Sequence, residues 1–157
     1  HKALSLGQIE QSVKDKGITF AHIIQVAMVL TGAGNLALVQ DDHVINKAKK
    51  SADKLNTHLC QKARGSHEIG YLASPVTGGG FNVNRFQQLF LTSIAQGKKQ
   101  PTEWAQFAWQ TIASQGQKLL KEGKALETAE ENLAELTGQA QVFAKKQLPI
   151  LKALQIA

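Results

Sequence analysis

The chain has 157 residues, of which 43% are hydrophobic and 19% charged, so it is long enough for a domain with a core, and its composition is not that of a disordered chain. A single cysteine, Cys60, excludes an internal disulfide framework and is typical of a reducing compartment, so we expect the cytoplasm. The net charge of +6 favours nucleic acid or an acidic surface as a partner. No apolar run approaches the roughly 20 residues that a membrane span needs. Because the chain begins with His1 rather than Met, we expect a fragment of a longer protein.

Two short helices and a strand are predicted first. Ser5 and Gln8 form a capping-box pattern at the start of the first helix, which ends at Gly17. A second helix over residues 19–30 begins at a threonine, which is a good N-cap. The apolar segment 35–40 follows two glycines and is predicted to be a strand.

A longer amphipathic helix is predicted over residues 41–65. Its apolar stripe is expected to consist of Val44, Ala48, Ala52, Leu55, Leu59 and Ala63. Four lysines flank this stripe: Lys47, Lys49, Lys50 and Lys54. A solvated helix face is the simpler interpretation of these lysines, and a surface that contacts an acidic partner is the alternative.

Three consecutive glycines, residues 78–80, lie between two short apolar runs. A phosphate-binding loop would need a lysine followed by Ser or Thr, and a dinucleotide-binding loop would need glycines at defined gaps, and this segment has neither. The glycines instead favour a tight hairpin near residues 70–83, since glycine supplies the positive φ of such a turn. Asn84 and Gln87 then form a capping box for the next helix.

From Thr102 onward the pattern is helical, and Pro149 is expected to kink or end the last helix. The order helix, turn, helix, strand and hairpin is that of a winged-helix-like unit, in which the hairpin is the wing. We therefore expect a mainly α fold with a small β element (α+β). A winged-helix-like domain would cover residues 1–97, and a helical C-terminal segment over residues 98–157 would pack on it, or both would form one domain.

No catalytic or metal site is predicted in this chain. The histidines have no metal-ligand spacing with Cys60 or with one another. His58 lies close to Cys60 in sequence, but residues two apart on a helix point in different directions. Four acidic residues of the last helix, residues 127–135, are predicted to lie on its exposed side. We assign no catalytic, cofactor-binding or metal-ligating residue.

Three segments of the sequence resemble a known family. They are “LNTHL” (55–59), “YLASPVTGGGFNVNRFQQLFL” (71–91) and “GKALETAEENLAEL” (123–136). They resemble the C-terminal part of bacterial class I S-adenosylmethionine methyltransferases that carry a methyltransferase regulatory domain, a group similar to the rickettsial protein-lysine methyltransferases. The resemblance is greatest between residues 55 and 136, and its motifs are structural in character.

The resemblance implies an S-adenosylmethionine-binding catalytic domain upstream of this chain. The chain itself would be a non-catalytic accessory domain that packs on the catalytic domain, forms a homodimer or contacts a substrate protein. The four lysines would face an acidic partner surface or the catalytic domain. The alternative is a winged-helix nucleic-acid-binding domain. Its second helix would offer only His22 and Gln25 as base readers, without Arg or Lys, which counts against DNA.

Overall fold

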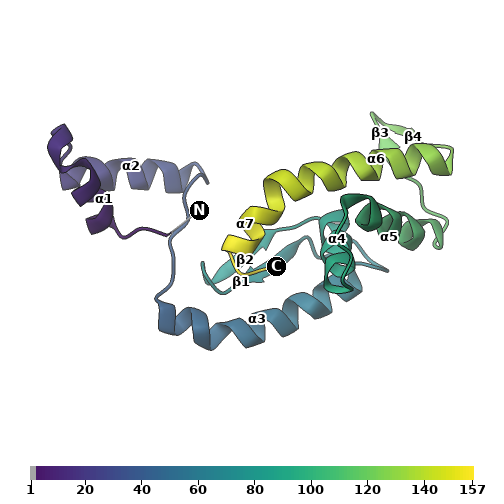
Figure 1. Ribbon diagram of the computed structural model, residues 1–157, viewed down its shortest axis with the longest axis horizontal. Helices are drawn as coiled ribbons and strands as arrows, with labels where there is room; N and C mark the ends of the chain where they lie inside the picture. Colours follow the sequence, from purple (N-terminus) through teal and green to yellow (C-terminus); the bar gives the residue numbers. More distant parts are fainter. Residues whose placement is uncertain (1–2) are drawn as a thin grey trace.

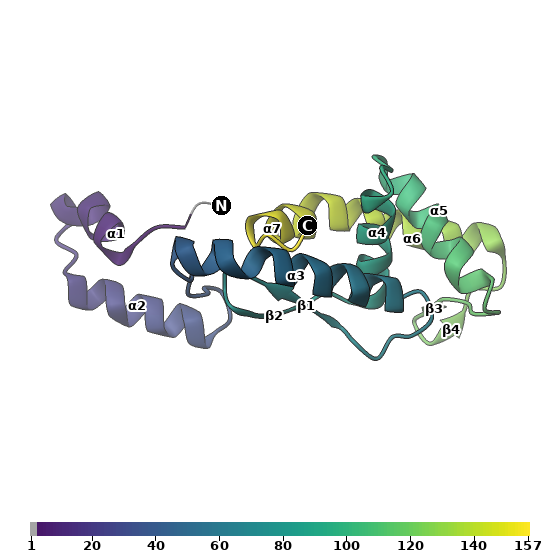
Figure 2. The same ribbon diagram turned by 90° about the horizontal axis from the view of Figure 1, so that it is seen from below.

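The computed structural model describes residues 3–157 and confirms a mainly α fold with a small β element. In chain order its elements are α1 (Leu6–Val13), a 3₁₀ turn η1 (Lys14–Lys16), α2 (Phe20–Gly32), α3 (Asp42–Lys62), β1 (Tyr71–Ser74), β2 (Gly79–Asn82), α4 (Arg85–Ala95), α5 (Pro101–Ala113), β3 (Leu120–Lys121), β4 (Lys124–Ala125), α6 (Ala129–Val142), a π turn η2 (Phe143–Gln147) and α7 (Leu148–Ala153). The strands form two antiparallel pairs, β1–β2 and β3–β4. The hairpin of α1 and α2 lies to one side of the other elements (Figures 1 and 2).

The predicted N-caps of the first two helices and the chain reversal at Gly17 are confirmed, whereas the second helix continues two residues further than predicted, to Gly32. The Ser5 hydroxyl accepts the Gln8 N–H while the Gln8 side chain accepts the Ser5 N–H, which completes the capping box. Gly17 has φ 69°, the left-handed conformation that lets the chain reverse after η1. Thr19 caps α2, and α2 packs back on α1.

The predicted strand at residues 35–40 is wrong, since no strand forms there. β1 and β2 pair with each other, in the register Tyr71 with Asn82, and the segment has no strand beside it with which to form a ladder. The segment 35–40 contacts the turn between β1 and β2 through Gln40, whose backbone N–H donates to the Val76 carbonyl at 2.8 Å. β1 packs on α3, and α1 packs on α2.

One apolar core joins the two halves expected on either side of residue 97. Phe90 of α4 lies 5.5 Å from Phe143 between ring centroids, and Trp104 of α5 meets Phe143 edge-on at 6.2 Å. The same cluster continues to Leu72 of β1 and Leu151 of α7, both almost fully buried. Residues on both sides of position 97 therefore share this core.

Two buried asparagines attach the strands to the helices. The Asn56 side-chain amide of α3 donates to the Ala73 carbonyl at 2.8 Å and accepts the Ala73 N–H at 2.7 Å. It therefore makes the two backbone hydrogen bonds that a neighbouring strand would otherwise make with β1 at Ala73. Asn132 of α6 accepts the Leu119 N–H and donates to the carbonyl of Leu126, on either side of β3–β4. Each side chain satisfies backbone groups that would otherwise lack partners.

The C-terminal half differs from the helical prediction at residues 120–125, and of the two alternatives for Pro149, a kink or an end, the end does not occur. Residues 120–125 form the hairpin β3–β4, and Glu122 and Gly123 have φ of 51° and 80°, as a two-residue turn requires. Pro149 does not end the last helix. The preceding turn widens instead, and the Leu148 N–H donates to the Phe143 carbonyl. Pro149 has no backbone N–H, and the π turn before it lets the helix continue through this position.

Candidate functional site

The α1–α2 hairpin exposes an apolar surface. Within α2 only His22, Gln25 and Thr31 are polar, and a helix that is apolar on all sides is ordinarily buried. Among residues 3–39, however, Ile23 alone is buried. The exposed side chains, which we call the hairpin surface, are Leu4, Leu6, Ile18, Phe20, Ile24, Val26, Met28, Val29, Leu30, Leu36, Leu38 and Val39.

The hairpin surface combines a hollow with an outward face. The hollow has a volume of about 650 Å³ and is lined almost entirely by apolar side chains, among them Ile9 of α1 and Val26 of α2. On the outward side, Met28 and Val29 are 69% and 70% exposed. Large exposed apolar surfaces are typical of sites that bind another protein, a membrane or a ligand.

The structure brings three of the four candidate lysines together. Lys47, Lys50 and Lys54 are exposed and lie three and four residues apart, so they share one face of α3, which we call the basic stripe. Lys49 points elsewhere and pairs with Asp53 one turn on. The three lysines of the basic stripe are therefore placed to meet one anionic surface.

The predicted apolar stripe of α3 is partly wrong. Leu55 is 48% exposed, whereas the buried residues of the helix include Ile45, Asn56 and Cys60. The buried face is turned toward Asn56 because this side chain bonds to β1. Apolar spacing could not reveal a buried polar residue that serves as a strand partner.

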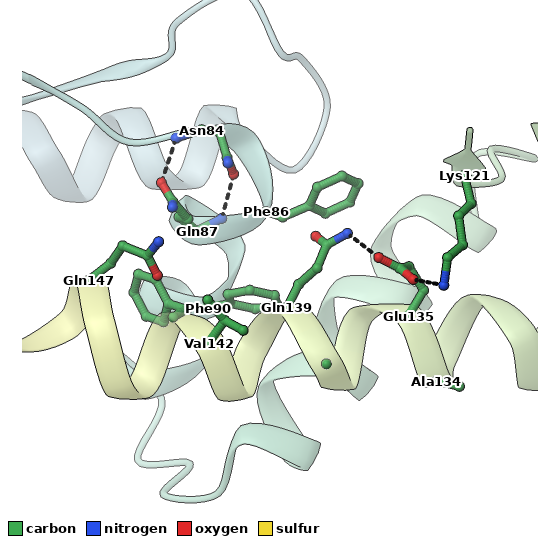
Figure 3. Close-up of a pocket in the computed structure, with 12 residues that line it drawn as sticks. Asn84, Phe86, Gln87, Phe90, Lys121, Ala134, Glu135, Gln139, Val142 and Gln147 are labelled. Carbon is green, nitrogen blue, oxygen red and sulfur yellow. Dashed lines mark hydrogen bonds and ion pairs between the residues drawn. The ribbon is translucent and has the colours of Figure 1, made fainter. Parts of the chain in front are cut away.

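A groove of about 710 Å³ runs between α4 and the α6–η2 helix (Figure 3). We call it the amide groove, because Asn84, Gln87, Gln139 and Gln147 line it. Apolar side chains also line it, and they are Phe86, Phe90, Ala134, Val142 and Phe143. The predicted capping box of Asn84 and Gln87 at the start of α4 is confirmed. The sequence pattern predicted no role for Gln139 or Gln147.

A charged pair closes one end of the amide groove. Lys121 Nζ lies 2.9 Å from a Glu135 carboxylate oxygen, and Gln139 Nε2 donates to the same carboxylate at 3.0 Å. The hydrogen bonds from Lys121 and Gln139 lower the pKa of Glu135, and the bond to Glu135 raises the pKa of Lys121. Both groups are thus held in their charged forms and compensate each other, which suits binding better than proton transfer.

No arrangement for catalysis is evident in the part of the chain that the structure describes. Burial raises the pKa of the Cys60 thiol to about 11, so this cysteine is a poor nucleophile. Across residues 3–157 no three His, Cys, Asp or Glu side chains gather in a way that could hold a metal ion. None of the helices described is long and apolar enough to cross a membrane.

No protein family and no solved structure matches the chain. A curated relative, the uncharacterized protein sll1526 of Synechocystis sp. (strain ATCC 27184 / PCC 6803 / Kazusa), is 40% identical over 154 residues. The match covers 98% of this chain but 30% of the relative, so the chain spans less than a third of the length of that protein.

Proposed function

We propose that this chain is a non-catalytic accessory domain of an S-adenosylmethionine-dependent, protein-directed methyltransferase, and that the hairpin surface holds it against the catalytic domain. The hairpin surface is the observation that carries the proposal. The three resembling segments, residues 55–59, 71–91 and 123–136, supply the identity of the partner.

Burial of the hairpin surface would stabilise a complex substantially. Transfer of a Val or Met side chain from water into an interface contributes about 1.5–3 kcal/mol. Val26, Met28 and Val29 are all more than half exposed and follow one another along α2. Together with the hollow between α1 and α2, they give the hairpin an apolar surface that a partner domain could cover.

A covalently linked partner is the occupant best supported. In the Synechocystis relative, about 70% of the polypeptide lies outside the matched segment, as the 30% coverage implies. Such a length accommodates a catalytic domain, which would usually be of about 100–200 residues or more. The basic stripe of α3 would then face an acidic part of this domain or of the protein that it modifies.

The test uses the full-length protein and its parts. The chain and the S-adenosylmethionine-binding domain are expressed separately, and their association is measured by titration calorimetry. Replacing Met28 and Val29 by glutamate together should weaken binding at least a hundredfold, since about 3 kcal/mol of apolar burial is lost. Leu120→Glu is the matched control: Leu120 is 71% exposed on β3, outside the hairpin surface, and its replacement should leave affinity unchanged.

Two results would overturn the proposal. One is equal affinity of the wild type and the double variant for the catalytic domain. The other comes from equilibrium dialysis with labelled S-adenosylmethionine, in which the full-length protein should bind the cofactor and the separate chain should not. Stoichiometric binding by the chain, or no binding by the full-length protein, contradicts the assignment.

A nucleic-acid-binding domain is the second candidate, and the basic stripe is the observation that favours it. Neutralising three phosphates would make duplex affinity fall with salt at a slope of about −2.7 in logarithmic units. Random-sequence duplex binding across a salt series therefore distinguishes the two candidates. The exposed face of α2 counts against this function, because it offers apolar side chains where a recognition helix presents polar ones.

A further inference from the structure

We propose that the amide groove binds an extended segment of a second protein. The inference depends on Gly138, on the amide groups along the groove and on its length. It does not depend on the methyltransferase assignment.

Gly138 lies in the middle of α6 and lines the amide groove. A mid-helix glycine is less stable than alanine by about 0.5–1 kcal/mol. Neither backbone nor packing calls for it here, because its φ is not positive and a Cβ at this position would have no atom within 4 Å. The missing side chain leaves the floor of the groove open to a bound segment.

The groove presents hydrogen-bonding groups that have no partner among residues 3–157. The Gln87 carbonyl accepts the Asn84 N–H, and the Asn84 carbonyl accepts the Gln87 N–H, so both NH₂ groups stay available. Gln139 uses its NH₂ group on Glu135, which leaves its carbonyl oxygen. The side-chain amide of Gln147 makes no hydrogen bond within residues 3–157, so it offers both a donor and an acceptor.

These donors and acceptors suit a polypeptide backbone. An extended chain presents N–H and C=O groups to its neighbours, and its side chains alternate between two sides. Phe86 and Val142 provide apolar contacts on opposite walls, and Val142 is 47% exposed (Figure 3). An apolar side chain of the bound segment would lie between them, above Gly138.

The length of the groove fits an extended segment. Gln147 follows Glu135 by twelve positions, and at about 1.5 Å for each position the helix between them spans about 18 Å. This equals about five residues of extended chain at about 3.3 Å each. A pocket for a small molecule encloses most of its ligand, whereas this groove is open along its side. Since Lys121 compensates Glu135, the groove also lacks the unpaired positive charge that a phosphate backbone would require.

The experiment is a selection of random dodecapeptides displayed on phage against the immobilised chain. Enriched peptides are synthesised with a fluorophore, and their affinity is measured by polarisation. Gly138→Leu would fill the floor of the groove, and Gln147→Ala would remove two backbone contacts. We expect affinity to fall at least tenfold for each. Gln106→Leu is the matched control, because Gln106 is exposed on α5 outside the groove, and it should bind as the wild type does.

Each outcome decides the proposal. Loss of binding in Gly138→Leu with retention in Gln106→Leu supports it. Equal binding by wild type and Gly138→Leu overturns it, since the peptides would then bind elsewhere. No enrichment above the bare matrix also overturns it. Thermal unfolding confirms that Gly138→Leu is folded, and its melting temperature should not fall, because leucine is a better helix former than glycine.

Discussion

Replacement of Asn56 by leucine tests the attachment of β1 to α3. Asn56 is 4% exposed, and its side-chain amide makes two hydrogen bonds with the backbone of Ala73, at 2.7 and 2.8 Å. Leucine has a similar volume and fits the same helix, but it removes both bonds. The Ala73 N–H and C=O would then face an apolar side chain.

The expected loss follows from these two backbone groups. An unsatisfied buried donor or acceptor costs about 1–3 kcal/mol. Ala73 is half-buried, so water can replace part of the loss, and we expect the free energy of unfolding to decrease by about 2–4 kcal/mol. At about 2–4 °C for each kcal/mol in a domain of this size, the melting temperature should fall by about 4–16 °C.

Urea unfolding followed by circular dichroism measures this loss. Asn46→Leu is the matched control, because Asn46 lies on the exposed side of the same helix, and its replacement should change the free energy by no more than about 0.5 kcal/mol. If Asn56→Leu lost no more stability than Asn46→Leu, the amide would not be holding β1, and the reasoning would fail.

Three further predictions concern charge and reactivity. Replacing the three lysines of the basic stripe by glutamate should weaken association with the proposed catalytic domain at low salt and have less effect at high salt. Lys49→Glu is the control, and unchanged affinity at low salt by calorimetry would exclude the stripe as a contact. Burial raises the pKa of the Cys60 thiol from 9.0 to about 11. At pH 8 the thiol should therefore react with iodoacetamide about a hundredfold more slowly in the folded chain than in the urea-unfolded chain, because about a hundredfold less of it is thiolate. Equal rates would show that the thiol is not buried. Hydrogen bonds from the backbone and side chain of Thr128 lower the pKa of Glu131, so the ionised carboxylate stabilises the fold above its unfolded pKa of 4.5, and this contribution is lost as pH falls through the folded pKa. In thermal unfolding, Glu131→Gln should therefore lose less stability than the wild type between pH 6 and pH 3. If the melting temperatures of the two proteins fell in parallel with pH, the assignment would be contradicted.

Local signals predicted the helices well because their causes are local. Ser5, Thr19 and Asn84 each begin a helix through a hydrogen bond within four residues, and Gly17 ends one with a positive φ. A short stretch of sequence contains all the residues that make such a cap. The cause of the β1–β2 hairpin is also local, because a single short turn connects the two strands. Of the three consecutive glycines, Gly78 alone has a positive φ.

Contacts distant in sequence were not predictable in this way. Asn56 reaches Ala73 seventeen residues on, and that bond turns the buried face of α3 away from Leu55. The segment 35–40 has the composition of a strand but no strand beside it. The amide groove is lined by side chains from residue 84 to residue 147, so neither segment reveals it alone.

The single buried side chain of the α1–α2 hairpin has a thermodynamic consequence. Two helices of 8 and 13 residues are too short to persist by themselves, and one buried isoleucine adds little tertiary stabilisation. Ordering of the hairpin and capture of its partner are therefore linked, and part of the interaction energy is consumed in fixing the helices. If the hairpin surface binds the proposed catalytic domain, this attachment would be weaker than its apolar area implies. The two domains would then separate and rejoin without unfolding of the core around Phe143.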